Sequence, residues 1–162
     1  MTPTYARAPR GQRAHGRAPA KCGTNLTLVA ALSLAGAGAA MTVSGALDGV
    51  ACEVYVREVL APTLRPGQTV MWDNLRAHRG AGARALIGAR GCRLLFLPPY
   101  SPDLNPIEEA FSKLKTALRR AEARTTEALE AAIGAALAAI TAQDAKGWFA
   151  HCGYRPLAEP PC

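Results

Sequence analysis

Two acidic side chains, Asp73 and Glu108, have the chemical type and the sequence setting of divalent-metal ligands. Hard cations such as Mg²⁺ prefer oxygen ligands, and carboxylates supply them. Asp73 directly follows the apolar run 69–72, and Glu108 lies in the first turn of a helix predicted to open at Asn105. Ligand sites in open α/β sheets form at the carboxyl ends of strands. An Asp from a strand end and a Glu from a later helix would therefore share one cation.

Each of the two carboxylates also has a purely structural interpretation. Asp73 and Asn74 are residue types that shape turns. Asn105 and Glu108 approximate a capping box, with Asn105 as the predicted N-cap, and the helix dipole favours an acid in the first turn. Taken singly, neither carboxylate distinguishes a metal site from an ordinary turn or helix start.

The face of the predicted helix separates Glu108 from its neighbour Glu109. At the helical period, Glu108 lies beside the apolar stripe, on the same flank as Lys115 and Arg119. Glu109 is expected to point further towards solvent. Glu108 is therefore the better candidate for a site at the edge of the core.

Short apolar runs and turn residues predict the elements that position these carboxylates. The run 69–72 follows the turn pair Pro66–Gly67, and the run 94–97 ends at two prolines; both suit buried strands. Helices are predicted over about 52–64, through 83–87, and from Thr126 onwards. This alternation of helix and strand indicates an α/β sheet.

Two segments of the chain resemble a known family. MWDNLRAH (71–78) and LLFLPPYSPDLNPIEEAFSKLK (94–115) resemble the second and third blocks of the DDE transposases, in the bacterial insertion-sequence branch of the mariner superfamily. Thirty-four residues separate Asp73 from Glu108, as between that superfamily's second and third catalytic carboxylates. Weaker similarity extends to YARAPRGQR, SGALDG and FAHCGY. The resemblance implies an α/β fold of ribonuclease H-like type, a mixed sheet flanked by helices.

The resemblance also implies a chemistry and its partners. Asp73 and Glu108 would be catalytic and would hold two Mg²⁺ or Mn²⁺ ions together with a third carboxylate. The family nicks DNA hydrolytically at element ends and then joins the freed 3′-hydroxyl to target DNA. Its partners are the transposon ends and the target, and a homodimer is left open. Asn74, His78 and Asn105 are expected to support the structure near the site without acting in catalysis.

The chain departs from the family pattern at its start. Residues 1–13 align with the segment that follows the family's first catalytic strand, so that strand, its Asp and the helix-turn-helix module before it are expected to be absent. Asp48 is the only Asp before Asp73, and its setting beside Gly49 is typical of a turn. A site with two carboxylates should hold a metal pair poorly, so we expect impaired catalysis. The alternative is a non-catalytic, basic DNA-binding remnant.

The net charge agrees with a polyanionic partner. Nineteen Lys and Arg against twelve Asp and Glu give a formal charge of +7, which favours nucleic acid without identifying it. A basic arm over 4–21 and the predicted Glu108 helix supply candidate phosphate contacts. The alternative is ordinary solvated charge at a terminus and on a helix. The candidates are Arg10, Arg13, Lys113, Lys115 and Arg119.

The uncharged stretch 22–47 has two interpretations. After a basic leader it could be a signal peptide or a membrane span, but its Gly, Ser and Thr residues dilute the hydrophobicity. We prefer two strands, about 26–34 and 40–46, joined by a turn at 36–38. No membrane partner is then expected. Five scattered cysteines without metal-ligand spacing indicate reduced thiols in a cytoplasmic protein.

The expected organisation has three parts. Residues 1–24 form a basic arm or partial hairpin, residues 25–124 a partial ribonuclease H-like DDE catalytic domain, and residues 125–162 a C-terminal helix and aromatic tail. Trp148, Phe149 and Tyr154 in that tail are expected to pin the C-terminus onto the core.

Overall fold

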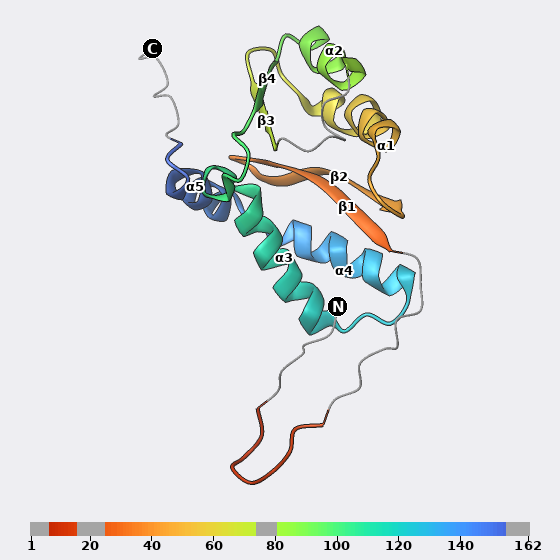
Figure 1. The fold of residues 1–162 in the computed structure, drawn as a ribbon, viewed down its shortest axis with the longest axis vertical. Helices are drawn as coiled ribbons and strands as arrows, with labels where there is room; N and C mark the ends of the chain where they lie inside the picture. The colour runs from red at the N-terminus through yellow and green to blue at the C-terminus, as the bar shows by residue number, and fades with distance from the viewer. Residues whose placement is uncertain (1–6, 16–24, 74–80, 155–162) are drawn as a thin grey trace.

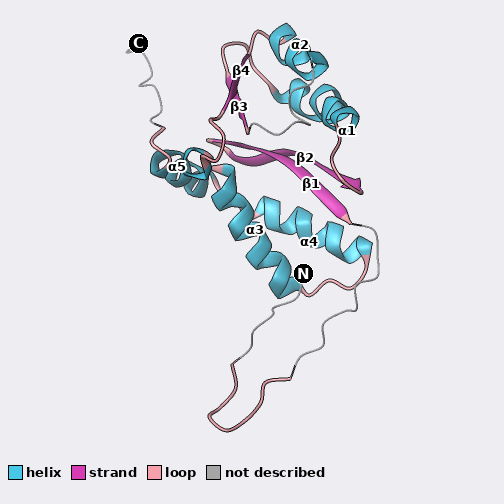
Figure 2. Ribbon diagram, viewed as in Figure 1, coloured by secondary structure: helices cyan, strands magenta, loops and turns pink. Residues whose placement is uncertain are grey.

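A computed structural model describes residues 7–15, 25–73 and 81–154 of the chain (Figure 1). Residues 7–15, from the predicted basic arm, form an exposed loop that projects away from the helices and strands. Asn74 and His78 lie outside the described residues. Helices and strands of the remaining described residues form a mixed α/β arrangement (Figure 2).

An antiparallel hairpin lies between helical layers. Strand β1 (Leu26–Ser33) pairs with β2 (Gly36–Ser44), with Val29 opposite Met41. The predicted hairpin is therefore confirmed, although the turn lies at residues 34–35 and Gly36 already belongs to β2. Its register shifts between Val29 and Ala31, which marks a β-bulge.

Helices cover both faces of this hairpin, which explains why its sequence carries no charge. Val29 and Met41 pack against one buried cluster, made of Tyr55, Val56, Leu60, Leu64, Ala83, Ile87 and Cys92. Leu26 and Leu28 pack against a second, made of Leu114, Leu118, Ile133 and Ala136. Strands buried on both faces have nearly continuous apolar sequences. None of the helices in the described ranges has the length and apolar character to cross a bilayer.

A second, parallel strand pair leads to the candidate site. Strand β3 (Thr69–Trp72) pairs with β4 (Arg93–Phe96), with Val70 opposite Leu94, and helix α2 (Ala81–Ala89) lies between them in the chain. Both predicted strands and the helix are confirmed to within one or two residues. The described strands make two separate two-stranded sheets and not one continuous mixed sheet, because neither strand of the hairpin pairs with β3 or β4.

The predicted helix over 52–64 is present but irregular. It consists of α1 (Gly49–Val54), the π-helical segment η1 (Tyr55–Leu60) and the 3₁₀ turn η2 (Ala61–Thr63). Asp48 caps α1 by accepting the Ala51 N–H at 2.8 Å. The Tyr55 hydroxyl donates to the Ala39 carbonyl at 2.8 Å, which fastens η1 to β2. Asp48 thus has the structural role expected of a turn residue.

Three helices follow β4: α3 (Ile107–Ala121), α4 (Thr126–Ala138) and α5 (Ala142–His151). Helix α4 confirms the prediction, with Thr125 as its cap. The sequence prediction had no helix at α5, and that omission was wrong. Thr141 and Asp144 form a capping box there, which is a local signal that could have found it.

The C-terminal aromatic residues hold α5 to the turn before α3. Phe149 and Tyr154 meet edge to face with their ring centroids 6.0 Å apart. The Tyr154 hydroxyl donates to the Leu104 carbonyl at 2.7 Å. These contacts link the last described residue to the start of α3, as expected of residues that pin the C-terminus.

Candidate active site

Asp73 leaves the parallel strand pair at its carboxyl end. The Leu97 N–H donates to the Trp72 carbonyl at 2.7 Å, so the chains leaving β3 and β4 lie side by side at this edge. Asp73 is half-buried, and Cys52 of α1 is buried. Burial raises the pKa of the Cys52 thiol, and the Asp73 carboxylate raises it further. Asp73 therefore sits at the strand end where the sequence predicted it.

The connection from β4 to α3 is built from short turns. Its middle forms the 3₁₀ turn η4 (Pro102–Leu104), in which the Asn105 N–H donates to the Pro102 carbonyl at 2.9 Å. The prediction that Asn105 caps the helix with its side chain was wrong. Asn105 closes η4, and Pro106 takes the cap position without a side-chain bond. The Glu108 N–H instead donates to the backbone carbonyl of Asn105 at 3.1 Å.

Helix α3 presents its two adjacent glutamates differently from the prediction. Glu108 is exposed, in the first turn of the helix. Glu109 was expected to point further towards solvent, but its carboxylate meets the His151 imidazole at 2.5 Å. This contact raises the pKa of His151. The cause is α5, the helix missing from the prediction, which packs along the Glu109 flank of α3.

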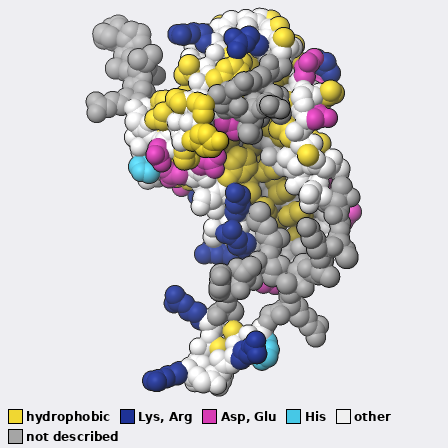
Figure 3. Space-filling model, in the orientation of Figure 1, with side chains coloured by type: hydrophobic (Ala, Val, Ile, Leu, Met, Phe, Trp, Pro, Cys, Tyr) yellow, Lys and Arg dark blue, Asp and Glu magenta, His cyan; other side chains and the backbone are white. Residues whose placement is uncertain are grey.

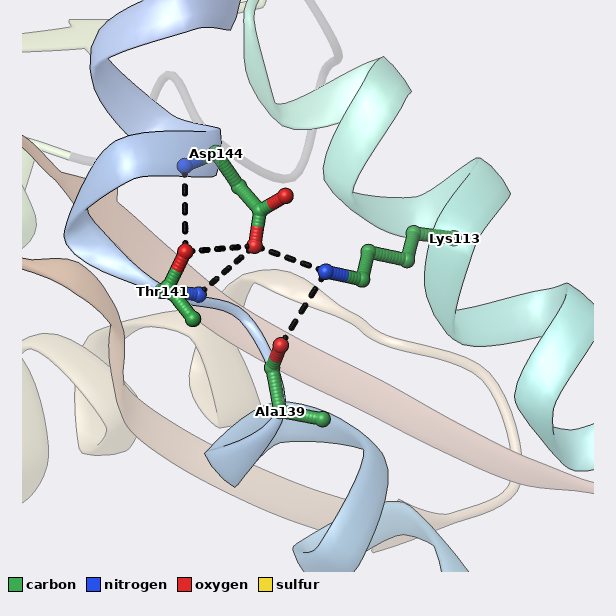
Figure 4. Close-up of polar contacts among 4 residues, drawn as sticks. All are labelled: Lys113, Ala139, Thr141 and Asp144. Carbon is green, nitrogen blue, oxygen red and sulfur yellow. Dashed lines mark hydrogen bonds and ion pairs between the residues drawn. The ribbon is translucent and has the colours of Figure 1, made fainter.

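The same flank carries Lys113, which binds neighbouring helices (Figure 4). Its ammonium donates to Asp144 Oδ2 at 2.7 Å and to the Ala139 carbonyl at 3.1 Å. Lys113 thereby joins α3 to the end of α4 and the start of α5. Beside it, Glu109, Arg120 and Trp148 help to line a groove of about 440 Å³ between α3 and α5. This contact network gives Lys113 a structural role in the folded chain.

Lys113 should make stability depend on pH at the acid end. Its hydrogen bond to Asp144, together with bonds from Thr141, lowers the pKa of that carboxyl from 3.8 to about 2. A depressed folded-state pKa contributes stability above the unfolded value, and that stability is lost as pH falls from about 4 to about 2. We expect Lys113→Met to lower the melting temperature at pH 5 and to flatten its fall over that interval.

The matched control for this prediction is Lys115→Met on the opposite flank of α3. That variant removes the same charge but should keep the wild-type slope of melting temperature against pH. Thermal unfolding followed by circular dichroism between pH 5 and pH 2.5 measures both. Equal slopes for the two variants would contradict the role given to the Lys113–Asp144 pair.

The other candidate phosphate contacts fall into two groups. Lys115 and Arg119 are exposed and share the Glu108 flank of α3. Arg10 and Arg13 are exposed on the projecting loop, apart from α3. Figure 3 shows Lys and Arg side chains over α3 and over this loop. Of the five basic residues predicted to contact phosphate, only Lys115 and Arg119 lie on the same flank of α3 as Glu108.

The donor set suits a hard divalent cation but is small. Asp73 and Glu108 offer carboxylate oxygens, the ligand type that Mg²⁺ and Mn²⁺ take in proteins. Across the described ranges, the His, Cys, Asp and Glu side chains make no group of three or more able to hold a metal ion. The residues present thus fit a cation in ligand type and leave most of its coordination to other groups, such as phosphate and water.

Comparison with known proteins places the chain in a family. Residues 1–130, which contain both Asp73 and Glu108, match the model of the DDE superfamily endonucleases. The crystal structure of the Mos1 strand transfer complex matches with a TM-score of 0.68 and 17% sequence identity. The match covers 92% of this chain and 45% of the Mos1 chain, so this chain spans less than half of that one. The likeness confirms the ribonuclease H-like fold. No curated protein matches the chain significantly. On the family match over residues 1–130, the chain belongs to the DDE superfamily of endonucleases.

Proposed function

We propose that this chain is a catalytic-domain portion of an insertion-sequence transposase, in which Asp73 and Glu108 bind divalent metal ions and direct cleavage and joining of DNA strands. The observation that carries the proposal is the family match, which spans both carboxylates. The position of Asp73 at a strand end and of Glu108 in a first helical turn supports it. DNA, as transposon ends and target, is the proposed partner, and the cytoplasm the proposed location.

The two carboxylates have complementary roles in this proposal. Mg²⁺ or Mn²⁺, when bound, supplies a Lewis acid and an activated water for phosphodiester hydrolysis. Asp73 is half-buried at the end of β3 and would supply one oxygen ligand. Glu108 is exposed and would supply a second oxygen ligand from the helix. Lys115 and Arg119, on its flank, would bind the DNA backbone.

Catalysis by this chain alone is proposed to be weak. Two carboxylates hold a pair of cations less firmly than three, and the described residues add no third ligand beside them. The same observation favours a second candidate function, a basic DNA-binding remnant without metal chemistry. We also propose the three-part organisation of the chain into residues 1–24, 25–124 and 125–162. In the structure, α4 and α5 of the third part pack onto α3 of the second.

Metal binding tests the proposal without requiring cleavage. We expect Mn²⁺ to bind the purified chain, as measured by the loss of the free-ion signal in electron paramagnetic resonance. Glu108→Gln should weaken that binding by at least about tenfold, since even loss of an outer-shell partner costs this much. Asp73→Asn should do the same.

Glu109→Gln is the matched control, because it changes the adjacent residue of the same helix in the same way. It removes the charge that pairs with His151 but should leave Mn²⁺ affinity within about twofold of wild type. Equal losses for Glu108→Gln and Glu109→Gln, or no Mn²⁺ binding by the wild type, would contradict the metal site and favour the DNA-binding remnant.

A further inference from the structure

The loop between β4 and α3 displays a tyrosine in an unusual way. Tyr100 has a φ of 56°, in the left-handed region that non-glycine residues seldom occupy. Tyr100 is fully exposed, so the ring packs against nothing in the described protein. The strain in its backbone is therefore not offset by burial of the ring.

The loop holds Tyr100 in place from both sides. Pro98 and Pro99 precede it and Pro102 follows closely, and each proline fixes one backbone angle. On the far side, η4 is closed by its own backbone bonds, and the Leu104 carbonyl is held by the Tyr154 hydroxyl. A strained residue persists where its surroundings over-determine it, and such residues cluster at ligand-binding sites.

The position of this loop points to the ligand. It runs from the edge where β3 and β4 end, beside Asp73, to the helix that carries Glu108. Two exposed prolines, Pro98 and Pro99, directly precede Tyr100 in the chain. Hydrophobic side chains gather near the start of α3 in Figure 3. A DNA strand bound at the two carboxylates would therefore bring the base next to the bound phosphate against a flat, apolar, rigid surface.

We propose that Tyr100 stacks on an unpaired base of the DNA strand, beside the phosphate that metal ions bound by Asp73 and Glu108 would hold. The proposal rests on the proposed function and deepens it by naming a base-contacting residue. An aromatic ring binds any base by its face, whatever the sequence, so the contact would favour DNA that is unpaired at this position. The chain's charge of +7 suits the backbone of the same strand.

The test measures binding to two DNA duplexes without cleavage. One carries a single unpaired 2-aminopurine, a fluorescent base that dims when stacked, and the other is fully paired. Anisotropy titrations with Ca²⁺ in place of Mg²⁺ give the affinities. We expect tighter binding to the bulged duplex, with quenching of 2-aminopurine. Tyr100→Ala should lower affinity for the bulged duplex by about tenfold and abolish the quenching.

Three further variants separate stacking from folding. Tyr100→Phe keeps the ring and should keep both affinity and quenching. Tyr100→Gly suits the positive φ, so its melting temperature should not fall below that of wild type although binding is lost. Leu104→Ala removes another exposed apolar side chain from the same loop and should leave the preference for unpaired DNA intact.

The outcomes also distinguish this proposal from the proposed function. Quenching that survives in Tyr100→Ala, or wild-type protein that binds both duplexes equally, would overturn the base contact. Dimerisation that Tyr100→Ala abolishes, with DNA binding unchanged, would assign the ring to a second copy and overturn it as well. If the wild-type protein neither binds Mn²⁺ nor cleaves DNA but still quenches 2-aminopurine through Tyr100, the metal site is contradicted and the base contact is supported.

Discussion

Asp73→Asn and Glu108→Gln are each expected to lower Mg²⁺-dependent nicking of supercoiled plasmid by about 100-fold or more. Metal catalysis of phosphodiester hydrolysis is worth several kcal/mol, and each substitution removes a carboxylate that would hold the metal. DNA binding should stay intact or become stronger, because a negative charge near the phosphates is lost. Gel shift and nicking assays on the same protein measure the two effects.

The nicking rate of the wild-type chain, measured in the same experiment, tests whether its catalysis is impaired. We expect slow nicking by the purified chain, since two carboxylates alone hold metal ions weakly. Glu109→Gln is again the control and should nick at the wild-type rate. Robust wild-type nicking would overturn the proposed impairment. Nicking that persists in both Asp73→Asn and Glu108→Gln would place catalysis elsewhere, and DNA binding without any nicking would support the remnant.

Gly36→Ala is expected to destabilise the chain by about 3 kcal/mol or more. Gly36 is buried at the start of β2 with a φ of 119°, a conformation that L side chains rarely adopt. An added Cβ would lie 2.7 Å from the backbone carbonyl oxygen of Ile140, at the junction of α4 and α5. Backbone cannot swing aside as a side chain does, so the hairpin and the two helices would have to separate.

Gly38→Ala is the matched control on the same strand. Its φ lies outside the positive region and an added Cβ would meet nothing within 4 Å. Urea unfolding followed by circular dichroism gives both free energies of unfolding. A loss for Gly36→Ala no larger than that for Gly38→Ala would show that the hairpin and the α4–α5 junction do not pack as described.

Elements with strong local patterns could be predicted from the sequence. Strand β3 was predicted at its observed bounds, because a turn pair precedes a short apolar run. Strand β4 and helices α2 and α4 were predicted to within one or two residues. The hairpin was predicted because Gly, Ser and Thr residues dilute the hydrophobicity of its uncharged sequence, and the structure adds that helices cover both of its faces.

Failures occurred where a distant element decided the outcome. Asn105 has the side chain of a helix cap, but the preceding 3₁₀ turn uses its backbone instead. Glu109 lies on the outer face by helical spacing alone, and α5 brings His151 to it. The bond of Lys113, a candidate phosphate contact, to Asp144 was not predicted either, because Asp144 lies thirty-one residues later in the chain.

The sequence by itself indicated the family, the two candidate carboxylates and the order of the elements that carry them, because each depends on residue types at short spacing. Only the tertiary structure decided which side chains of α3 bind other helices and which are exposed, because α5 packs on one flank of α3. It also decided that Tyr100 stands strained and exposed beside the strand ends. Backbone strain and packing between helices depend on contacts between residues far apart in the chain, which no local pattern records.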